Sequence, residues 1–218
     1  MATVAIVPIK RFGSAKSRLA GTSASGLRPA LAEAMLTDVL NELARSEELE
    51  RTVVVSGEPA AALIAHDFRA DHLGDPTDAG HSEAALLGIA HAVGIGATTV
   101  VLLPGDCPLL RSAEVDEALS RHRSGVAVIP DRHGSGTNGL ILTPPGAIVP
   151  AFGAGSRERH LALAREAGVP AEVAEIPSLA LDLDTGEDLR ELSAVLAADP
   201  AIAPATAAAL ALLGESIS

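Results

Sequence analysis

The chain has 218 residues, of which 48% are hydrophobic, and a mean hydropathy of +0.31, so it can bury a sizeable core and is not expected to be disordered. Its net charge is −12 and only 1% of its residues are aromatic, which excludes both a basic surface and a row of stacking rings for nucleic acid. The single cysteine, Cys107, excludes an internal disulfide and a cysteine-based zinc site, as is typical of cytoplasmic proteins.

Short β-branched runs alternate with helical patterns along the chain. The runs at 4–9, 52–56, 98–103, 126–130 and 140–143 are expected to be buried strands. Between the first two, one apolar helix face recurs at every fourth residue: Leu27, Leu31, Met35, Val39 and Leu43. Further helices are expected over 82–93, 113–121, 157–167 and 185–197. This order predicts a three-layer α/β/α sandwich with a mostly parallel, mixed sheet, which binds ligands at the carboxyl ends of its strands.

Nothing in the sequence indicates a second domain or a membrane segment. No repeat or linker interrupts it, so residues 1–218 are expected to form a single domain. The first apolar stretch has no basic region before it and is typical of a strand, not of a signal peptide. The uncharged stretch 200–214 is shorter than the ~20 residues of a membrane span. We expect it to be a helix that packs on the body of the protein or on a second subunit of a homodimer.

A basic loop follows the first expected strand. Lys10, Arg11, Lys16 and Arg18 occur within nine residues there. Their side chains, with backbone N–H groups, could bind a chain of phosphates, although a solvated basic loop is the simpler alternative. The loop matches neither Gly-x-x-x-x-Gly-Lys-Ser/Thr nor Gly-x-Gly-x-x-Gly, so P-loop and dinucleotide-binding folds are not favoured.

A carboxylate follows the strand expected at 98–103. Asp106 stands in the run Pro104-Gly105-Asp106-Cys107-Pro108, where two prolines restrict the backbone. Carboxylate oxygens are ligands that Mg²⁺ prefers, and phosphates usually complete its shell. The sequence therefore indicates a metal site at this strand end, or else a turn or helix-capping aspartate.

A second acidic cluster lies further along the chain. Asp182 and Asp184 point the same way if the backbone is extended, since side chains then alternate with period two. They could close a metal site with Asp106. Alternatively, Asp184 or Thr185 caps the next helix, whose first turn is acidic.

Two glycine-containing loops could hold an acceptor molecule. In the loop 131–139 three glycines permit close backbone approach, and Thr137 and Asn138 offer hydrogen bonds to an anionic or carbonyl group. This loop could also be a plain hairpin. Further along, Gly153 and Ser156 precede a helix whose N-terminus would attract a phosphate or carboxylate. Otherwise Ser156 is an ordinary N-cap.

Two other kinds of site are not indicated. No His-x-x-x-His pair occurs, and no Gly-x-Ser-x-Gly elbow, so neither a histidine metal site nor an α/β serine hydrolase is favoured. Of the seven histidines, His160 lies nearest the second glycine loop and is the one to test.

Taken together, these segments resemble the 2-phospholactate or phosphoenolpyruvate guanylyltransferases of deazaflavin coenzyme (F-420) biosynthesis. The likeness spans nearly the whole chain. It rests on Val7-Pro8-Ile9-Lys10, Lys16-Ser17-Arg18-Leu19, Gly105-Asp106-Cys107-Pro108-Leu109, Thr137-Asn138-Gly139 and Leu181-Asp182-Leu183-Asp184-Thr185. The combination is specific, whereas each piece alone would be weak.

The resemblance implies a sheet of the nucleotide-diphospho-sugar transferase (glycosyltransferase-A) type. It also implies transfer of GMP from GTP to phosphoenolpyruvate or 2-phospho-L-lactate, with release of pyrophosphate and with Mg²⁺, in two ions, as cofactor. The implied nucleotide contacts are Pro8, Lys10, Lys16, Arg18, Ser82 and Pro104, and the implied catalytic residues are Lys16, Arg18 and Asp106. Acceptor contacts map onto Thr137, Gly153 and Ser156, to which the residue pattern adds Asn138. The metal ligands would be Asp106, Asp182 and Asp184.

One segment departs from the family pattern, and two other functions remain open. Where relatives often have Gly-Leu-Asn, this chain has Gly80-His81-Ser82, which puts the preference for guanine in doubt. A molybdopterin guanylyltransferase or another sugar-type nucleotidyltransferase is the nearest rival, although its usual Gly-Gly-x-Ser-x-Arg-Met-Gly loop is missing here. A nucleotide-binding regulator that performs no reaction is the other alternative. The presence of Asp106 together with Asp182 and Asp184 argues against it, since a protein that only binds nucleotide has less need of paired metal ligands.

Overall fold

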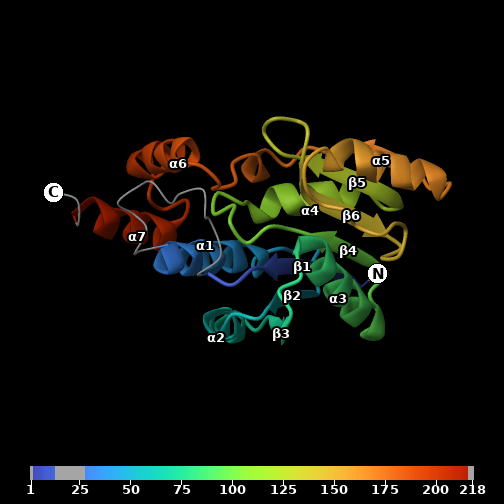
Figure 1. Ribbon diagram of the computed structural model, residues 1–218, viewed down its shortest axis with the longest axis horizontal. Coiled ribbons are helices and arrows are strands. Elements are labelled where there is room, and N and C mark those ends of the chain that lie inside the picture. Colours follow the sequence, from blue (N-terminus) through green and yellow to red (C-terminus); the bar gives the residue numbers. More distant parts are fainter. Residues whose placement is uncertain (1, 13–27, 216–218) are drawn as a thin grey trace.

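A single twisted sheet organises the chain in the computed structural model, which describes residues 2–12 and 28–215 (Figure 1). The strand order is β3-β2-β1-β4-β6-β5-β7. Among these strands only β6 runs against its neighbours β4 and β5; the other pairs are parallel. The strands are β1 (Thr3–Ile9), β2 (Arg51–Ser56), β3 (Asp71–Leu73), β4 (Thr99–Leu102), β5 (Gly125–Pro130), β6 (Thr137–Thr143) and β7 (Ala171–Val173).

Helices cover both faces of this sheet. They are α1 (Arg28–Leu43), α2 (Pro59–Asp67), α3 (His81–Gly94), α4 (Ser112–Arg121), α5 (Ser156–Glu166), α6 (Gly186–Ala198) and α7 (Pro204–Glu215). Because strand side chains alternate, Ala5 and Val7 of β1 pack into one apolar cluster and Val4 and Ile6 into another. The first cluster includes residues of α1, α2, α4 and α6, and the second includes residues of α3 and α5.

The expected α/β/α fold is confirmed, and the expected strands and helices end within one residue of their predicted bounds, except that β6 begins three residues earlier, at Thr137. Three elements were not expected. Strands β3 and β7 have three residues each and no fully buried side chain, so they carry no apolar run. Helix α2 buries only Ala61 and Ala65, which gives a weak periodic signal.

The C-terminal helix α7 packs on the body of the protein, beside α1 (Figure 1). Asp38 of α1 is buried and caps the first turn of α7. Its carboxylate accepts hydrogen bonds from the amide of Ala205 at 3.1 Å and from the amide and hydroxyl of Thr206 at 2.7 Å each. This arrangement confirms the first of the two alternatives for the stretch 200–214. Within the described ranges, no helix has the length and apolar character that crossing a bilayer requires.

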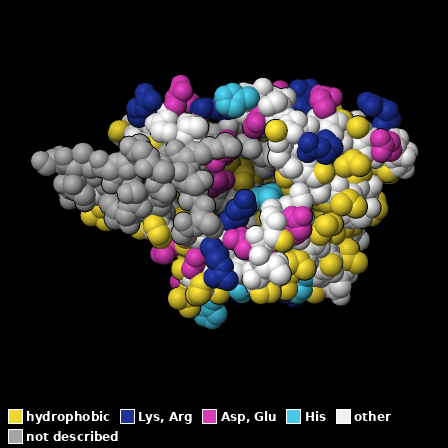
Figure 2. Space-filling model, viewed as in Figure 1, with side chains coloured by type: hydrophobic (Ala, Val, Ile, Leu, Met, Phe, Trp, Pro, Cys, Tyr) yellow, Lys and Arg dark blue, Asp and Glu magenta, His cyan; other side chains and the backbone are white. Residues whose placement is uncertain are grey.

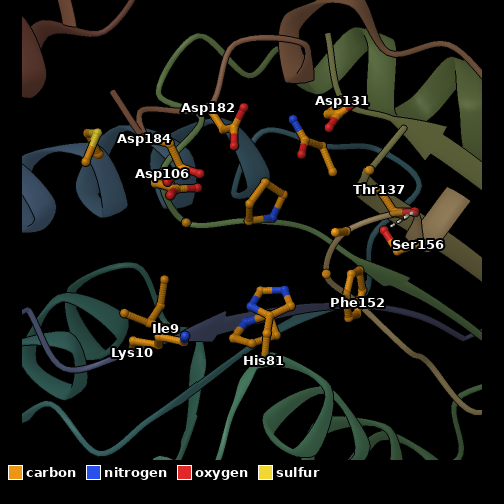
Figure 3. A pocket seen from close by; sticks show the side chains of 18 of the residues that line it. Ile9, Lys10, His81, Asp106, Asp131, Thr137, Phe152, Ser156, Asp182 and Asp184 are labelled. Atoms are coloured by element: carbon orange, nitrogen blue, oxygen red, sulfur yellow. Dashed lines mark hydrogen bonds between the residues drawn. The ribbon is translucent and has the colours of Figure 1, made fainter. Parts of the chain in front are cut away.

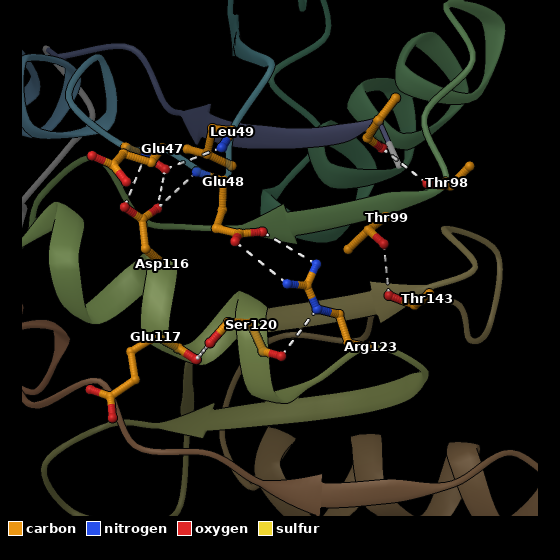
Figure 4. A network of polar contacts seen from close by, with 12 residues as sticks. Glu47, Glu48, Leu49, Thr98, Thr99, Asp116, Glu117, Ser120, Arg123 and Thr143 are labelled. Atoms are coloured by element: carbon orange, nitrogen blue, oxygen red, sulfur yellow. Dashed lines mark hydrogen bonds and ion pairs between the residues drawn. The ribbon is translucent and has the colours of Figure 1, made fainter.

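Polar contacts fix the connections at the amino ends of the parallel strands (Figure 4). Asp116 of α4 accepts hydrogen bonds from the amides of Glu47 and Glu48 at 3.0 and 3.3 Å, and Arg123 pairs with the Glu48 carboxylate. At the same edge the hydroxyls of Thr99 and Thr143 join β4 to β6 at 2.9 Å. This edge is therefore held by structural contacts, and the opposite edge is open for a site.

The opposite edge gathers the polar strand ends. Strands β1, β4 and β5 end there, which brings Lys10, Asp106 and Asp131 to one side of the sheet. Because β6 is antiparallel, it begins at this edge, with Thr137. The reversal of one strand thus adds a fourth polar position to the carboxyl edge.

Candidate active site

A cavity of about 690 Å³ opens at the carboxyl edge of the sheet. Figure 3 shows Asp106, Asp182 and Asp184 on one side of it, Lys10 and His81 on another, and Thr137, Phe152 and Ser156 on a third. Figure 2 shows a hollow on the face of the molecule that it presents, with acidic, basic and histidine side chains near its rim. The cavity is polar enough to bind an ion and large enough for a nucleotide-sized ligand.

The end of β1 supplies the basic side of the cavity. Pro8 and the exposed Lys10 line it, together with the buried ring of Phe12. The amide of Phe12 donates a hydrogen bond to Oε2 of Glu58, at the start of α2, at 3.1 Å. This bond fixes the direction in which the chain leaves β1, with Lys10 beside the cavity.

Gly105 allows the ends of β1 and β4 to approach closely. A Cβ atom at this position would lie 1.9 Å from Cδ1 of Ile9, so any other residue here would require the Ile9 side chain to move. Pro104 and Asp106, on either side, both line the cavity. Helix α4 begins only at Ser112, so Asp106 does not cap it. The glycine therefore sets the Asp106 carboxylate opposite the basic end of β1.

The segment before α6 presents two more carboxylates. Thr185 and Asp188 form a reciprocal capping box, in which the amide of Thr185 donates to Asp188 Oδ2 at 2.6 Å. The expected cap is thus Thr185, and the Asp184 carboxylate instead lines the cavity, as does Asp182. Asn138 Nδ2 donates to the Leu179 carbonyl oxygen at 2.8 Å and so ties this segment to β6.

The three aspartates interact electrostatically. Burial raises the pKa of the Asp182 carboxyl, and the Asp106 and Asp184 carboxylates raise it further, whereas hydrogen bonds from its own amide and from Asn138 oppose the rise. A set of hard, mutually repelling oxygen donors fits a divalent cation such as Mg²⁺. Within the described part of the chain, however, no three His, Cys, Asp or Glu side chains are arranged as a complete metal-binding group. Protein atoms alone therefore do not form a closed cage here.

Thr137 and Ser156 meet on the third side of the cavity. Ser156 Oγ donates to Thr137 Oγ1 at 3.1 Å, and the Nδ1 atom of His160 lies 3.1 Å from the same oxygen. The N-cap of α5 is Gly155, in a left-handed conformation with φ 70°, so the alternative that Ser156 is the N-cap is wrong. The Ser156 hydroxyl instead takes part in a buried polar cluster beside the cavity.

Phe152, His81 and Ser82 connect the first turn of α3 to the loop before α5. The His81 and Phe152 rings meet edge to face with centroids 4.6 Å apart, and Phe152 meets His160 in the same manner at 5.2 Å. The amide of Phe152 donates to Ser82 Oγ at 3.0 Å. Burial lowers the pKa of His81; Asp106 opposes this shift and Lys10 adds to it, so the ring is neutral at pH 7.

Most of the site residues expected from the sequence line this one cavity: Pro8, Lys10, Pro104, Asp106, Thr137, Asn138, Gly153, Ser156, Asp182 and Asp184. Ser82 is not among the lining residues, because its hydroxyl faces the Phe152 amide. Lys16 and Arg18 lie outside the described residues. The sequence analysis missed His81, Asp131 and Phe152 as lining residues. For His81 a signal existed, since it stands where the sequence departs from the family pattern.

Comparisons with known proteins show the family and the fold. Residues 3–196 match the family model described as guanylyl transferase CofC like. The phosphoenolpyruvate guanylyltransferase of Conexibacter woesei is 49% identical over 200 residues, which are 90% of each chain, and that of Sphaerobacter thermophilus is 39% identical over 88% of this chain and 93% of its own. A crystal structure described as a candidate nucleotide-diphospho-sugar transferase of Desulfovibrio desulfuricans G20 superposes with a TM-score of 0.75, at 18% identity, over 96% of this chain and 94% of its own.

Proposed function

The chain belongs to the CofC-like guanylyl transferase family, and from that premise we propose that it transfers GMP from GTP to phosphoenolpyruvate. The nucleotidyltransferase activity follows from the family; the choice of acceptor is the proposal. One observation supports it most: a basic strand end, three aspartates and a hydroxyl pair line a single cavity. These are the groups that a triphosphate, a divalent cation and a small anionic acceptor each require.

The reaction requires no proton transfer. An oxygen of the acceptor's phosphate forms a bond to the α-phosphorus of GTP, while the bond from that phosphorus to the departing pyrophosphate breaks. Both reactants are anions, so their mutual repulsion is the main obstacle. Lys10 lies where it can offset this charge, and Lys16 and Arg18, from the same basic segment of the sequence, are proposed to act with it.

We propose Asp106, Asp182 and Asp184 as the residues that would hold Mg²⁺. When bound, the ion would supply Lewis-acid stabilisation of phosphate charge. Protein carboxylates usually fill only one or two positions around Mg²⁺, and the nucleotide's phosphates fill others. The strand ends thus provide part of the shell, and the substrate would complete it.

The opposite side of the cavity is proposed to bind the acceptor. Thr137 and Ser156 provide hydroxyls, and Gly153, with φ 111°, is exposed in the loop before α5. The amides of Ser156 and Arg157, at the start of α5, donate to the carbonyl oxygens of Gly153 and Ser135, so the helix favours an anion near this loop mainly through its dipole. Such a subsite holds the acceptor in line with the α-phosphorus, and positioning of this kind is a large part of phosphoryl-transfer catalysis.

A product analysis tests the proposal. Purified protein is incubated with GTP, Mg²⁺ and, in separate reactions, phosphoenolpyruvate, 2-phospho-L-lactate or 3-phosphoglycerate. Pyrophosphate release and product mass are then measured. We expect pyrophosphate and enolpyruvoyl-diphospho-guanosine in the first reaction at the highest rate. A higher rate with another acid would reassign the acceptor, and tight GTP binding without any pyrophosphate release would refute the transferase activity.

A further inference from the structure

His160 is completely buried beside the proposed acceptor subsite, and both of its ring nitrogens have partners. Its side chain projects from α5 and is 0% exposed. The amide of Ala151 donates a hydrogen bond to Nε2 at 2.9 Å, and Nδ1 lies 3.1 Å from the hydroxyl oxygen of Thr137. Both polar atoms of this buried ring are therefore satisfied.

The Ala151 amide determines where the imidazole carries its proton. Because an N–H group can only donate, Nε2 must present a lone pair, and the proton of the neutral ring is then on Nδ1. Burial, helped by the positive charge of Arg159, lowers the pKa of His160 to about 4. The ring is therefore neutral near pH 7, and Nδ1–H donates to Thr137.

The hydrogen of the Thr137 hydroxyl consequently has only one direction in which it can point. A hydroxyl oxygen has two lone pairs and one hydrogen. One lone pair accepts from His160 Nδ1 and the other from Ser156 Oγ. Among the described residues, none accepts the Thr137 O–H, and Thr137 lines the cavity. The hydrogen can therefore only point away from His160 and Ser156, toward the cavity.

We infer that His160 is a positioning residue, which makes the Thr137 hydroxyl a dedicated donor to an anionic oxygen of the acceptor. The inference rests on the proposed function, because it takes Thr137 to be part of the acceptor subsite. It deepens that proposal in one respect. At this atom the subsite favours ligands that present an acceptor-only oxygen, such as a carboxylate or phosphate, because the Thr137 oxygen has no lone pair left for a ligand hydroxyl.

Helix α5 and the preceding loop hold the arrangement in place. Arg159 donates to the carbonyl oxygens of Ala151 and Ala154 at 2.7 and 2.8 Å, and the Phe152 ring packs on the imidazole. The loop that carries Gly153 is thus fixed by the same helix that carries His160. His160 therefore connects the backbone of the loop, through Ala151, to the hydroxyl on β6.

The first test requires no substrate. Two-dimensional ¹H–¹⁵N spectra of the imidazole nitrogens report the tautomer of each histidine, and His160→Asn assigns the signal by its loss. We expect a neutral ring with the proton on Nδ1 at pH 7. A proton on Nε2, or a charged ring, overturns the inference regardless of what the protein catalyses.

The second test is a double-mutant cycle in steady-state kinetics. His160→Gln can still accept from Ala151 but lacks a donor at the position of Nδ1, whereas His160→Asn keeps that donor. We expect His160→Gln to raise KM for phosphoenolpyruvate about tenfold and KM for GTP less than about twofold. His160→Asn should recover most of the loss.

The same cycle separates positioning from a structural role. In a Thr137→Val background, His160→Gln should have an additional effect of less than about twofold on the acceptor KM, because its target is gone. If the effects of Thr137→Val and His160→Gln on the acceptor KM multiply in the double variant, the inference is overturned. If the wild-type protein turns over no acceptor, the proposed function fails, and the tautomer measurement still decides the role of His160.

Discussion

Ser82, in the first turn of α3, accepts a hydrogen bond from the amide of Phe152 at 3.0 Å, although the two residues are 70 positions apart in the chain. This bond joins α3, which begins at His81, to the loop that carries Gly153. It gives Ser82 a structural contact with the loop that is proposed to bind the acceptor, and the nucleotide contact implied by the family resemblance stays a prediction.

We therefore expect Ser82→Ala to loosen the acceptor loop. The Phe152 amide would lose its partner, and such a loss typically costs about 1–3 kcal/mol. The acceptor KM should rise about three- to tenfold, with KM for GTP nearly unchanged, and Ser82→Thr, which keeps the hydroxyl, should stay close to wild type. An increase confined to KM for GTP would instead support Ser82 as a nucleotide contact.

Asp106→Asn should remove most turnover and leave the fold intact. The substitution keeps the shape of the side chain but removes one negative charge from the set of three aspartates that line the cavity. We expect kcat to fall at least ~100-fold, with an unchanged circular dichroism spectrum and an unfolding temperature no lower than wild type. Asp67→Asn, at an exposed position at the end of α2, is the matched control. Near-normal turnover of the Asp106 variant would remove this residue from the mechanism.

The carboxyl-edge site was predictable because parallel strands end at the same edge of a sheet. Lys10 and Asp106 each follow a buried apolar run, so reading the runs as strands was enough to place both side chains in one cavity. Asp184 was less certain, since the sequence alone could not separate a cavity-facing carboxylate from a helix cap. The capping box of Thr185 and Asp188 settles that question.

What the sequence could not predict are contacts between distant segments. The roles of Ser82 and His160 depend on hydrogen bonds to Phe152 and Thr137, and no local pattern encodes a partner 70 or 23 positions away. Strand β7 gives no clear sequence signal either, because it has only three residues, all exposed, and its backbone makes the pairing with β5. Local patterns thus place the elements, and packing determines which side chains meet.

A buried carboxylate caps the C-terminal helix, which also packs apolar residues on the core. Asp38 accepts three hydrogen bonds from the first turn of α7, and Thr206 is completely buried. We expect Asp38→Ala to lower the free energy of unfolding by about 2 kcal/mol, equivalent to roughly 4–8 °C in Tm for a chain of this size, with both KM values unchanged. Asp199→Ala, which removes an exposed carboxylate with one backbone partner, should have little effect. Wild-type stability in the Asp38 variant would contradict the assigned cap.

Acidification should destabilise the protein in part through His160. Its folded-state pKa is lowered from 6.5 to about 4, because burial disfavours the charged ring and Arg159 repels it. Between these two values the unfolded chain binds a proton that the folded protein does not, so stability falls as the pH is lowered through this window and levels off below about 4. The contribution of this one group is roughly 3 kcal/mol over the window.

Urea unfolding of the wild type and of His160→Gln between pH 7.5 and pH 4.5 isolates this contribution. The difference in unfolding free energy between the two proteins should shift in favour of the variant as the pH falls, since glutamine does not titrate and the other groups are common to both. His66→Gln serves as the control for loss of a histidine, because the His66 side chain is 90% exposed. A constant difference between wild type and His160→Gln would mean that the imidazole titrates normally in the folded protein, and the dedicated-donor role of Thr137 would then lose its support.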